Sequence, residues 1–138
     1  MLFRSSAVCS VSADPPQLLA CINRQAETHA LIEGASAFAV NVLAHHQHRL
    51  AKVFAGASGV YGDHRFAEAE WRTLVTGAPV LSTCVASFDC RLIELVPAAT
   101  HSIFIGRVVA VELQAELDPL VYVEGDYGLI APLMSSAR

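Results

Sequence analysis

Histidine is the residue type whose number and spacing first suggest chemistry in this sequence. The 138 residues include six histidines, and three of them fall in the run His45-His46-Gln47-His48. On a helix, His45 and His48 would be three residues apart on one face, a spacing that can chelate a metal ion. The sequence offers no HExxH, no CxxC and no paired acidic motif near a second histidine to complete such a site. A solvated polar helix face explains the run more simply, so we predict no metal site.

A second candidate is Asp63-His64-Arg65, where an acid and a base lie side by side in a glycine-rich stretch. Asp63 could equally serve as an ordinary helix cap, because aspartate is a preferred capping residue. The sequence lacks GxSxG, GxGxxG and GxxxxGK[ST], which disfavours a hydrolase elbow, a Rossmann dinucleotide site and a P-loop.

Four scattered cysteines form no CxxC pair: Cys9, Cys21, Cys84 and Cys90. We interpret them as small, half-buried apolar residues with reduced thiols, and we assign none of them as a nucleophile. The N-terminal residues have no long apolar segment. Together these features predict a cytoplasmic protein.

His101 is the most informative single residue, because it opens a long and otherwise apolar stretch, HSIFIGRVVAVEL, over residues 101–113. A histidine at the start of a strand lies at the rim of a sheet, where its side chain can point into a cleft. Histidine also satisfies strand ends in a purely structural way, so the position alone leaves both interpretations open.

Composition limits the class of protein. Apolar residues make up 54% of the chain and charged residues 16%, with 9 basic against 13 acidic side chains and a single lysine, Lys52. This balance fits one globular domain over residues 1–138 and disfavours nucleic-acid binding. The mean hydropathy is +0.45, yet no window reaches the ~18 uninterrupted apolar residues of a membrane span. The apolar excess therefore belongs to a core or a subunit interface.

Hydrophobic periodicity predicts the elements that must position these residues. We expect strands at residues 7–12, 18–22, 38–43, 82–89, 91–96, 101–113 and 120–124. We expect three helices: one capped by Thr28 and ended by Gly34, one over residues 44–54, and one over 67–74. Turns are expected at 13–16, 97–99 and 118–119. The fold class is thus mainly β with helical insertions, as a barrel or sandwich.

Several segments in unbroken order resemble the flavin reductase-like family, the small reductase components of two-component flavin monooxygenases. They are SAVCSVSADPPQLLACINRQAETHALI (6–32), FAVNVL with the following FAG (38–56), RFAEAEW (65–71), HSIFIGRVVAV (101–111) and PLVYVEGDYG (119–128). The resemblance implies an FMN-binding split β-barrel, a homodimer, and reduction of a freely exchanging flavin, FMN or FAD, by NADH or NADPH. It also implies a partner monooxygenase that uses the reduced flavin.

The sequence departs from the family at two places. Family members usually carry a helix and a barrel strand ahead of the segment that begins here at Ser5, which implies an N-terminally incomplete barrel with an exposed edge. They commonly have Gly-Asp where this chain has Ala99-Thr100. That second change removes a carboxylate next to His101.

The resemblance also suggests which residues hold the cofactors. The flavin ring would lie against a strand of small residues, Ser5, Ser6, Ala7, Val8, Cys9 and Ser10. Its phosphate would be held by Asn23, Arg24, Gln25 and Thr28, with Arg24 supplying the charge. His101 would lie beside the nicotinamide. Phe54 and Tyr127 would border the flavin, with core packing and turn formation as their respective alternatives.

Three functions follow from these observations. The first is an NAD(P)H-dependent flavin reductase with micromolar or weaker affinity for FMN, whose chemistry belongs to the cofactor and needs no protein nucleophile. The second is a non-catalytic flavin-binding or dimer-scaffold protein of the same family. The third, haem or metal binding through His45 and His48, has less support.

Overall fold

The computed structural model describes residues 7–56, 59, 62–114 and 116–134. Ser5 and Ser6, the first two residues of the proposed flavin strand, lie outside the described residues, as does part of the glycine-rich stretch after Phe54. The remaining residues form nine strands and four helical segments.

The strands are β1 (Val8–Ala13), β2 (Pro16–Asn23), β3 (Ala37–Val42), β4 (Trp71–Arg72), β5 (Val80–Leu81), β6 (Ala86–Ala98), β7 (His101–Leu113), β8 (Val121–Val123) and β9 (Asp126–Gly128). The helices are α1 (Glu27–Ala35) and α2 (His48–Phe54), with two 3-10 segments, η1 (His45–Gln47) and η2 (Gly62–Glu68). The expectation of a mainly β domain with helical insertions is confirmed.

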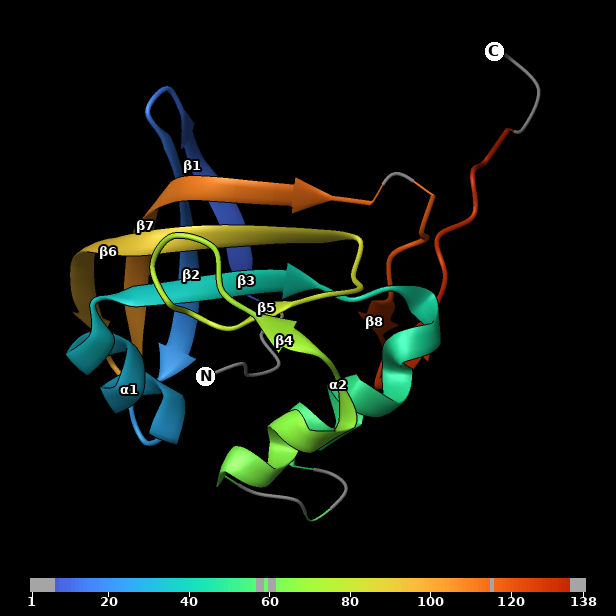
Figure 1. Ribbon diagram of the computed structural model, residues 1–138, viewed down its shortest axis with the longest axis horizontal. Coiled ribbons are helices and arrows are strands. Elements are labelled where there is room, and N and C mark those ends of the chain that lie inside the picture. The colour runs from blue at the N-terminus through green and yellow to red at the C-terminus, as the bar shows by residue number, and fades with distance from the viewer. Residues whose placement is uncertain (1–6, 57–58, 60–61, 115, 135–138) are drawn as a thin grey trace.

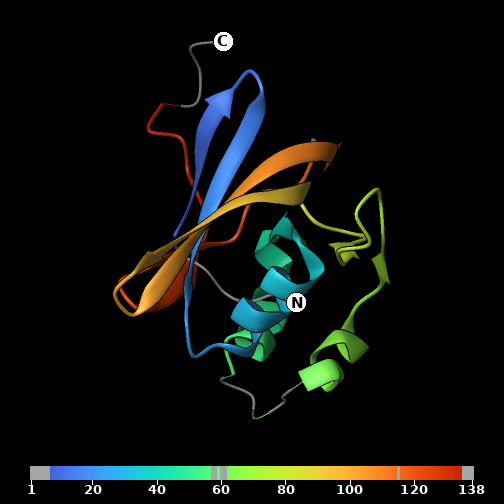
Figure 2. The same ribbon diagram turned by 90° about the vertical axis from the view of Figure 1, so that its left-hand side faces the viewer.

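One five-stranded antiparallel sheet, in the order β1-β2-β7-β6-β3, carries the architecture. The long hairpin of β6 and β7 forms its centre (Figure 1). Figure 2 shows the helices gathered on one side of this twisted layer. Two small hairpins, β4–β5 and β8–β9, lie outside the main sheet. The strands alternate buried and exposed positions, as expected where one face packs on a core and the other is less covered.

The first hydrophobic core lies between the sheet and α1. It contains Leu18, Ala20, Ile22, Ile32, Phe38, Cys90 and Phe104. Gly106 of β7 faces the Phe38 ring so closely that an added Cβ would lie 2.6 Å from Phe38 Cζ. A side chain at this position would therefore displace the ring, which explains the glycine in the middle of a long strand.

A second, smaller core holds the helical insertions against the sheet. Its buried members are Leu50, Val53, Phe54, Leu81 and Cys84. The rings of Phe54, Phe66 and Trp71 meet edge to face, with centroids 4.9 to 5.7 Å apart. The predicted pattern over residues 44–54 is confirmed as helical, although its first turn is a 3-10 segment.

The structure corrects both ends of the first predicted helix. The chain makes a turn in which Ala26 N donates to Asn23 O (3.0 Å), and α1 then begins at Glu27 with Ala26 as its N-cap residue. Thr28 is therefore inside the helix and buried, and it is not the cap. The helix runs through Gly34 to Ala35 and ends at Ser36, which adopts a left-handed φ of 55°.

Two other predicted elements are wrong. Residues 67–74 do not form a helix, because η2 ends at Glu68 and Trp71 starts a short strand. Trp71 packs on the second core, and its Nε1 donates to Phe66 O (3.0 Å), which holds the chain extended. Of the separate strands predicted at 82–89 and 91–96, residues 82–85 form no strand, and the rest belong to one strand, β6, in which two register shifts interrupt the regular alternation.

Candidate functional site

The end of β2 and the start of β7 meet at one rim of the sheet. Asn23 is the register partner of His101 in the β2–β7 ladder. Arg24 N donates to Thr100 O (2.9 Å), and Thr100 Oγ1 lies 2.8 Å from His101 Nδ1. The structure thus brings the predicted phosphate-binding residues next to the predicted nicotinamide-binding histidine, although more than 70 residues separate them in sequence. We call Asn23, Arg24, Thr100 and His101 the rim cluster.

The turn between β2 and α1 presents a cation to solvent. Asn23 Oδ1 accepts a hydrogen bond from Gln25 N (2.9 Å), which fixes the turn. Asn23, Arg24 and Gln25 are exposed, whereas Thr28 is 2% exposed. Within the described residues Arg24 takes part in no ion pair. An exposed guanidinium held on an ordered turn is suited to binding an anion.

The strand expected to contact the flavin ring is the edge strand of the sheet. Val8, Cys9 and Ser10 lie on β1 and are exposed, and Ala7 O accepts from Cys21 N (3.0 Å). In the described part of the chain, β1 has β2 as its neighbour on one side and no strand on the other. An edge strand presents backbone donors and acceptors outward, so a planar ligand edge can pair with it. Cys9 is exposed, so its interpretation as half-buried is wrong.

Phe54 and Tyr127 pack at two further places, outside the contacts of the rim cluster. Phe54 is 4% exposed and belongs to the second core, which fits its core-packing alternative. Tyr127 packs beside Tyr122 (centroids 5.1 Å apart), and Lys52 Nζ lies 6.0 Å from the centre of its ring. Figure 1 shows α2 and β8 at the opposite end of the long axis from α1. In the described part of the chain, therefore, neither residue makes a ring contact or a side-chain hydrogen bond with the rim cluster.

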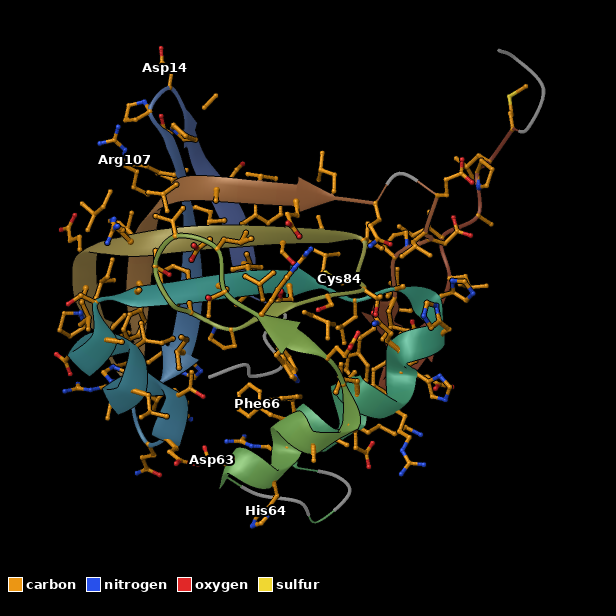
Figure 3. The ribbon with its side chains drawn as sticks, in the orientation of Figure 1. Asp14, Asp63, His64, Phe66, Cys84 and Arg107 are labelled. Carbon is orange, nitrogen blue, oxygen red and sulfur yellow. The ribbon has the colours of Figure 1, made fainter. Side chains whose placement is uncertain are left out.

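The two sequence motifs that first suggested chemistry lie on exposed segments. His45, His46 and His48 are exposed on η1 and at the start of α2. Among the described residues, no three His, Cys, Asp or Glu side chains come together as a metal site. Asp63 and His64 are exposed on η2 (Figure 3), whereas Arg65 is buried.

Sequence reasoning missed a contact directly behind the rim. His29 Nε2 lies 2.8 Å from Ser102 Oγ, and the His29 ring packs edge to face on Phe104 (4.9 Å). This contact ties α1 to the strand that carries His101. The only signal in the sequence was a histidine one residue after Thr28, and its partner is 73 positions away.

Sequence reasoning also missed the extent of burial around Cys90. Burial and the neighbouring Asp89 carboxylate raise the pKa of the Cys90 thiol to about 12. A thiol with such a pKa is protonated at neutral pH and is a poor nucleophile. This agrees with the absence of a nucleophile from the predicted chemistry.

The chain belongs to the flavin reductase like domain family, which matches residues 3–131. It is 44% identical over 120 residues to the FMN reductase (NADH) RutF of Bradyrhizobium diazoefficiens, an alignment that covers 87% of this chain and 66% of that protein. The chain thus spans just under two thirds of the length of this relative.

Solved structures show the same fold. The NADH:FAD oxidoreductase SgcE6 of Streptomyces globisporus C-1027, in complex with NAD and FAD fragments, superposes with a TM-score of 0.86 at 26% identity. That match covers 96% of this chain and 79% of SgcE6. BorF, the flavin reductase component of a bacterial two-component tryptophan halogenase, superposes with a TM-score of 0.85 at 31% identity, covering 94% of this chain and 82% of BorF. Within the described residues, no helix has the length and apolar character needed to span a membrane.

Proposed function

We propose that this chain is an NADH-dependent FMN reductase and that it supplies reduced flavin to a partner monooxygenase. The name of the Bradyrhizobium relative supports the choice of FMN and NADH, and the halogenase component supports a flavin-consuming partner. FAD and NADPH remain the alternatives in the test below. The bound flavin supplies the redox chemistry by accepting a hydride, so the protein needs to bind and orient the two nucleotides.

The observation that carries this proposal is the rim cluster. Arg24 offers a guanidinium without an ion-pair partner in the described part of the chain, and Asn23 fixes the turn that presents it. His101 stands in register with Asn23 on the adjacent strand. An anion-binding cation and an orienting histidine are thus adjacent, as a site for a phosphorylated flavin and a nicotinamide requires.

The residues present fit an FMN molecule. Exposed β1 offers backbone groups from Val8 to Ser10 to the polar edge of the ring, and the small side chains of this strand allow close approach. Arg24 would hold the phosphate. His101, whose Nδ1 is next to Thr100 Oγ1, would present Nε2 to the nicotinamide or to the flavin ring.

We further propose one domain over residues 1–138, a homodimer and a cytoplasmic location. Free cysteines are typical of a reducing compartment. The exposed apolar side chains would gain burial in a subunit interface. They include Ile93, Val111, Leu113, Leu129, Ile130, Leu133 and Met134. Light scattering should show a dimer, and a monomer at working concentration would contradict the homodimer.

Titration of flavin fluorescence, followed by NADH oxidation with FMN in excess, tests the function. We expect quenching with a micromolar Kd and turnover with NADH. FAD and NADPH in parallel assays establish the preference for each nucleotide. Binding without turnover on either nicotinamide would support the scaffold alternative, and absence of quenching by FMN and FAD would exclude a flavin site.

A further inference from the structure

Arg65 is the buried member of the motif that sequence analysis considered for acid/base chemistry. It is 9% exposed. Its Nε donates to Gly62 O (3.1 Å), and its guanidinium carbon lies 5.6 Å from the centre of the Phe54 ring. Its Nη2 reaches Glu27 Oε2 at 3.5 Å. A carbonyl, an aromatic face and a carboxylate therefore fix this cation beside the start of α1.

Glu27 directly follows the turn that presents Arg24. The hydrogen bond from Ala26 N to Asn23 O closes this turn, which keeps its ends within about 7 Å of each other. Figure 3 shows Asp63, at the start of η2, close to the β2–α1 turn in that view, and the Arg65–Glu27 ion pair establishes that the two elements are in contact. Arg65 thus stands on the side of Glu27 that faces η2, beside the turn that carries the proposed phosphate ligand.

The ion pair between Arg65 and Glu27 is weak enough for a phosphate to replace the Glu27 carboxylate as the partner of Arg65. Its 3.5 Å separation is long for a charge-assisted hydrogen bond, and the Glu27 side chain is 64% exposed. A phosphate dianion offers a guanidinium more charge and more acceptor oxygens than one carboxylate does. Glu27 also places a negative charge beside any phosphate bound at Arg24, and like charges at this range repel each other.

We infer that Arg65 is a second cation for the flavin phosphate, and that Glu27 holds it while lowering the affinity of the site for phosphate. The inference rests on the proposed function, because it takes Arg24 as the first phosphate ligand. It makes the Arg65–Glu27 pair a determinant of specificity for FMN over riboflavin, which has the same ring system and no phosphate.

The two members of the pair should have opposite effects on FMN. Arg65→Met, which keeps much of the apolar stem, should weaken FMN binding by about tenfold through loss of one charge-assisted contact. Glu27→Gln should tighten FMN binding by about two- to fivefold, because it removes the repulsion and the carboxylate that competes with phosphate for Arg65. Both variants should change riboflavin binding by less than about twofold, since riboflavin carries no charge for either residue to act on.

The experiment measures FMN and riboflavin dissociation constants by fluorescence quenching for the wild type and both variants. Arg49 and Glu68 provide the matched control, because they form an exposed ion pair with two 3.0 Å contacts. Arg49→Met and Glu68→Gln should leave the ratio of the two constants unchanged.

Equal weakening of both flavins by Arg65→Met would overturn the inference, because it would show a structural role. If Arg65→Met does not fold, Glu27→Gln decides, and an unchanged ratio of the FMN and riboflavin constants then overturns the inference. A wild type that binds neither FMN nor FAD overturns the proposed function instead. If the wild type binds and reduces FMN, but the Arg65 and Glu27 variants have the same ratio of FMN and riboflavin constants as the control variants, only the role of Arg65 is overturned.

Discussion

Two polar regions of the sheet differ in how their hydrogen bonds are satisfied. In the rim cluster, Arg24 and His101 are exposed, and their side chains make few contacts within the described protein. Beneath the β4–β5 segment, by contrast, Asp89 is fully buried and accepts from Val75 N (2.8 Å), Thr76 N (2.9 Å) and Thr76 Oγ1. We call this second region the interior cluster.

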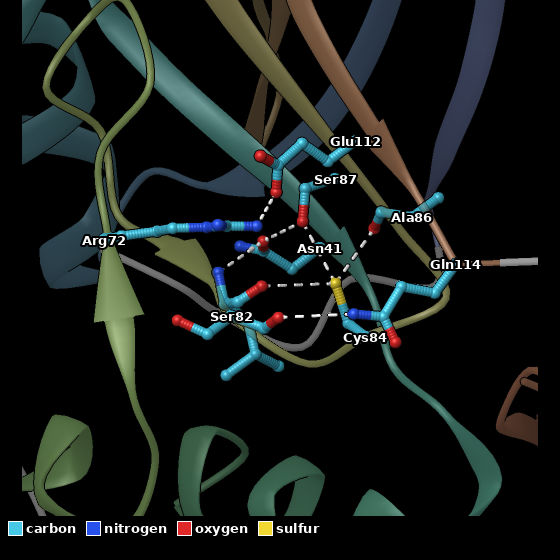
Figure 4. Close-up of polar contacts among 9 residues, drawn as sticks. Asn41, Arg72, Ser82, Cys84, Ala86, Ser87, Glu112 and Gln114 are labelled. Carbon is cyan, nitrogen blue, oxygen red and sulfur yellow. Dashed lines mark hydrogen bonds and ion pairs between the residues drawn. The ribbon is translucent and has the colours of Figure 1, made fainter.

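The interior cluster extends through Asn41 on β3. Asn41 Oδ1 accepts from Leu81 N (3.0 Å) and from Ser87 Oγ (2.8 Å), and Asn41 Nδ2 donates to Pro79 O (3.2 Å). Figure 4 shows the part of this network around Asn41 and Ser87, with Cys84 Sγ beside Ser87 Oγ. In the part of the chain that the structure describes, no buried side-chain nitrogen or oxygen lacks a partner. Polar groups with such complete internal bonding stabilise the fold, whereas those at the rim remain available to a ligand.

Replacement of His101 should have the largest effect and should act on the rim alone. His101→Ala removes a positioned hydrogen-bonding group at the start of β7, which typically costs ~2–4 kcal/mol in the transition state. We expect NADH oxidation to fall by roughly 30- to 1,000-fold, with FMN affinity and Tm nearly unchanged. His46→Ala, an exposed histidine on η1, is the control. A lower Tm with unaltered turnover per folded molecule would instead assign His101 a structural role.

Replacement of Asp89 should show the converse behaviour. Asp89→Asn removes a charged acceptor of three hydrogen bonds and leaves buried donors poorly matched. Urea unfolding should show a loss of about 1–3 kcal/mol, with little change in flavin affinity. Asp14→Asn, at the exposed tip of the β1–β2 hairpin in Figure 3, should leave stability unchanged. A loss of flavin binding in folded Asp89→Asn protein would contradict the inference that the interior cluster serves stability and the rim cluster serves binding.

Replacement of Gly106 tests how tightly β7 packs against Phe38 and Cys90 behind the rim. An added Cβ would lie 2.6 Å from Phe38 Cζ and 2.8 Å from Cys90 Cβ. Gly106→Ala should therefore destabilise the protein by about 1–3 kcal/mol. Gly34→Ala is the matched control: it meets nothing within 4 Å on α1, and helix propensity favours it by up to ~1 kcal/mol. Equal thermal midpoints for the two variants would show that the Phe38 ring moves aside without any loss of stability.

The pH dependence of stability tests the burial of Cys90 and should leave the rim unaffected. The folded pKa of Cys90 is raised to about 12 from an ordinary value of 9.0. Because the unfolded chain loses this proton first, the contribution of Cys90 to stability is complete below pH 9.0 and falls as pH rises toward 12. The difference in urea midpoint between wild type and Cys90→Ala should therefore shrink above pH 9.0. A constant difference across this range would contradict the raised pKa.

Local sequence patterns were enough to predict the strands in which apolar alternation along the chain matches the burial seen in the fold. The apolar run that begins at His101 is β7 over the predicted residues 101–113, and the alternation from Phe38 is β3 within one residue. Prediction failed where a distant contact decided the structure. Trp71 is held by Phe66 and the second core, which converts a helical pattern into a strand. Two register shifts in β6 interrupt its alternation, so the sequence pattern did not predict a single 13-residue strand.

Alternation and short motifs were sufficient to predict the fold class and the family, because they depend on neighbours along the chain. The candidate site residues stay a prediction from the same motifs. Which of the predicted site residues meet became known from the folded chain. The tertiary structure placed Asn23 opposite His101, buried Arg65 against Glu27 and packed Tyr127 beside Tyr122. Strand register and the pairing of distant side chains depend on the whole packed core, and no local window of sequence contains that information.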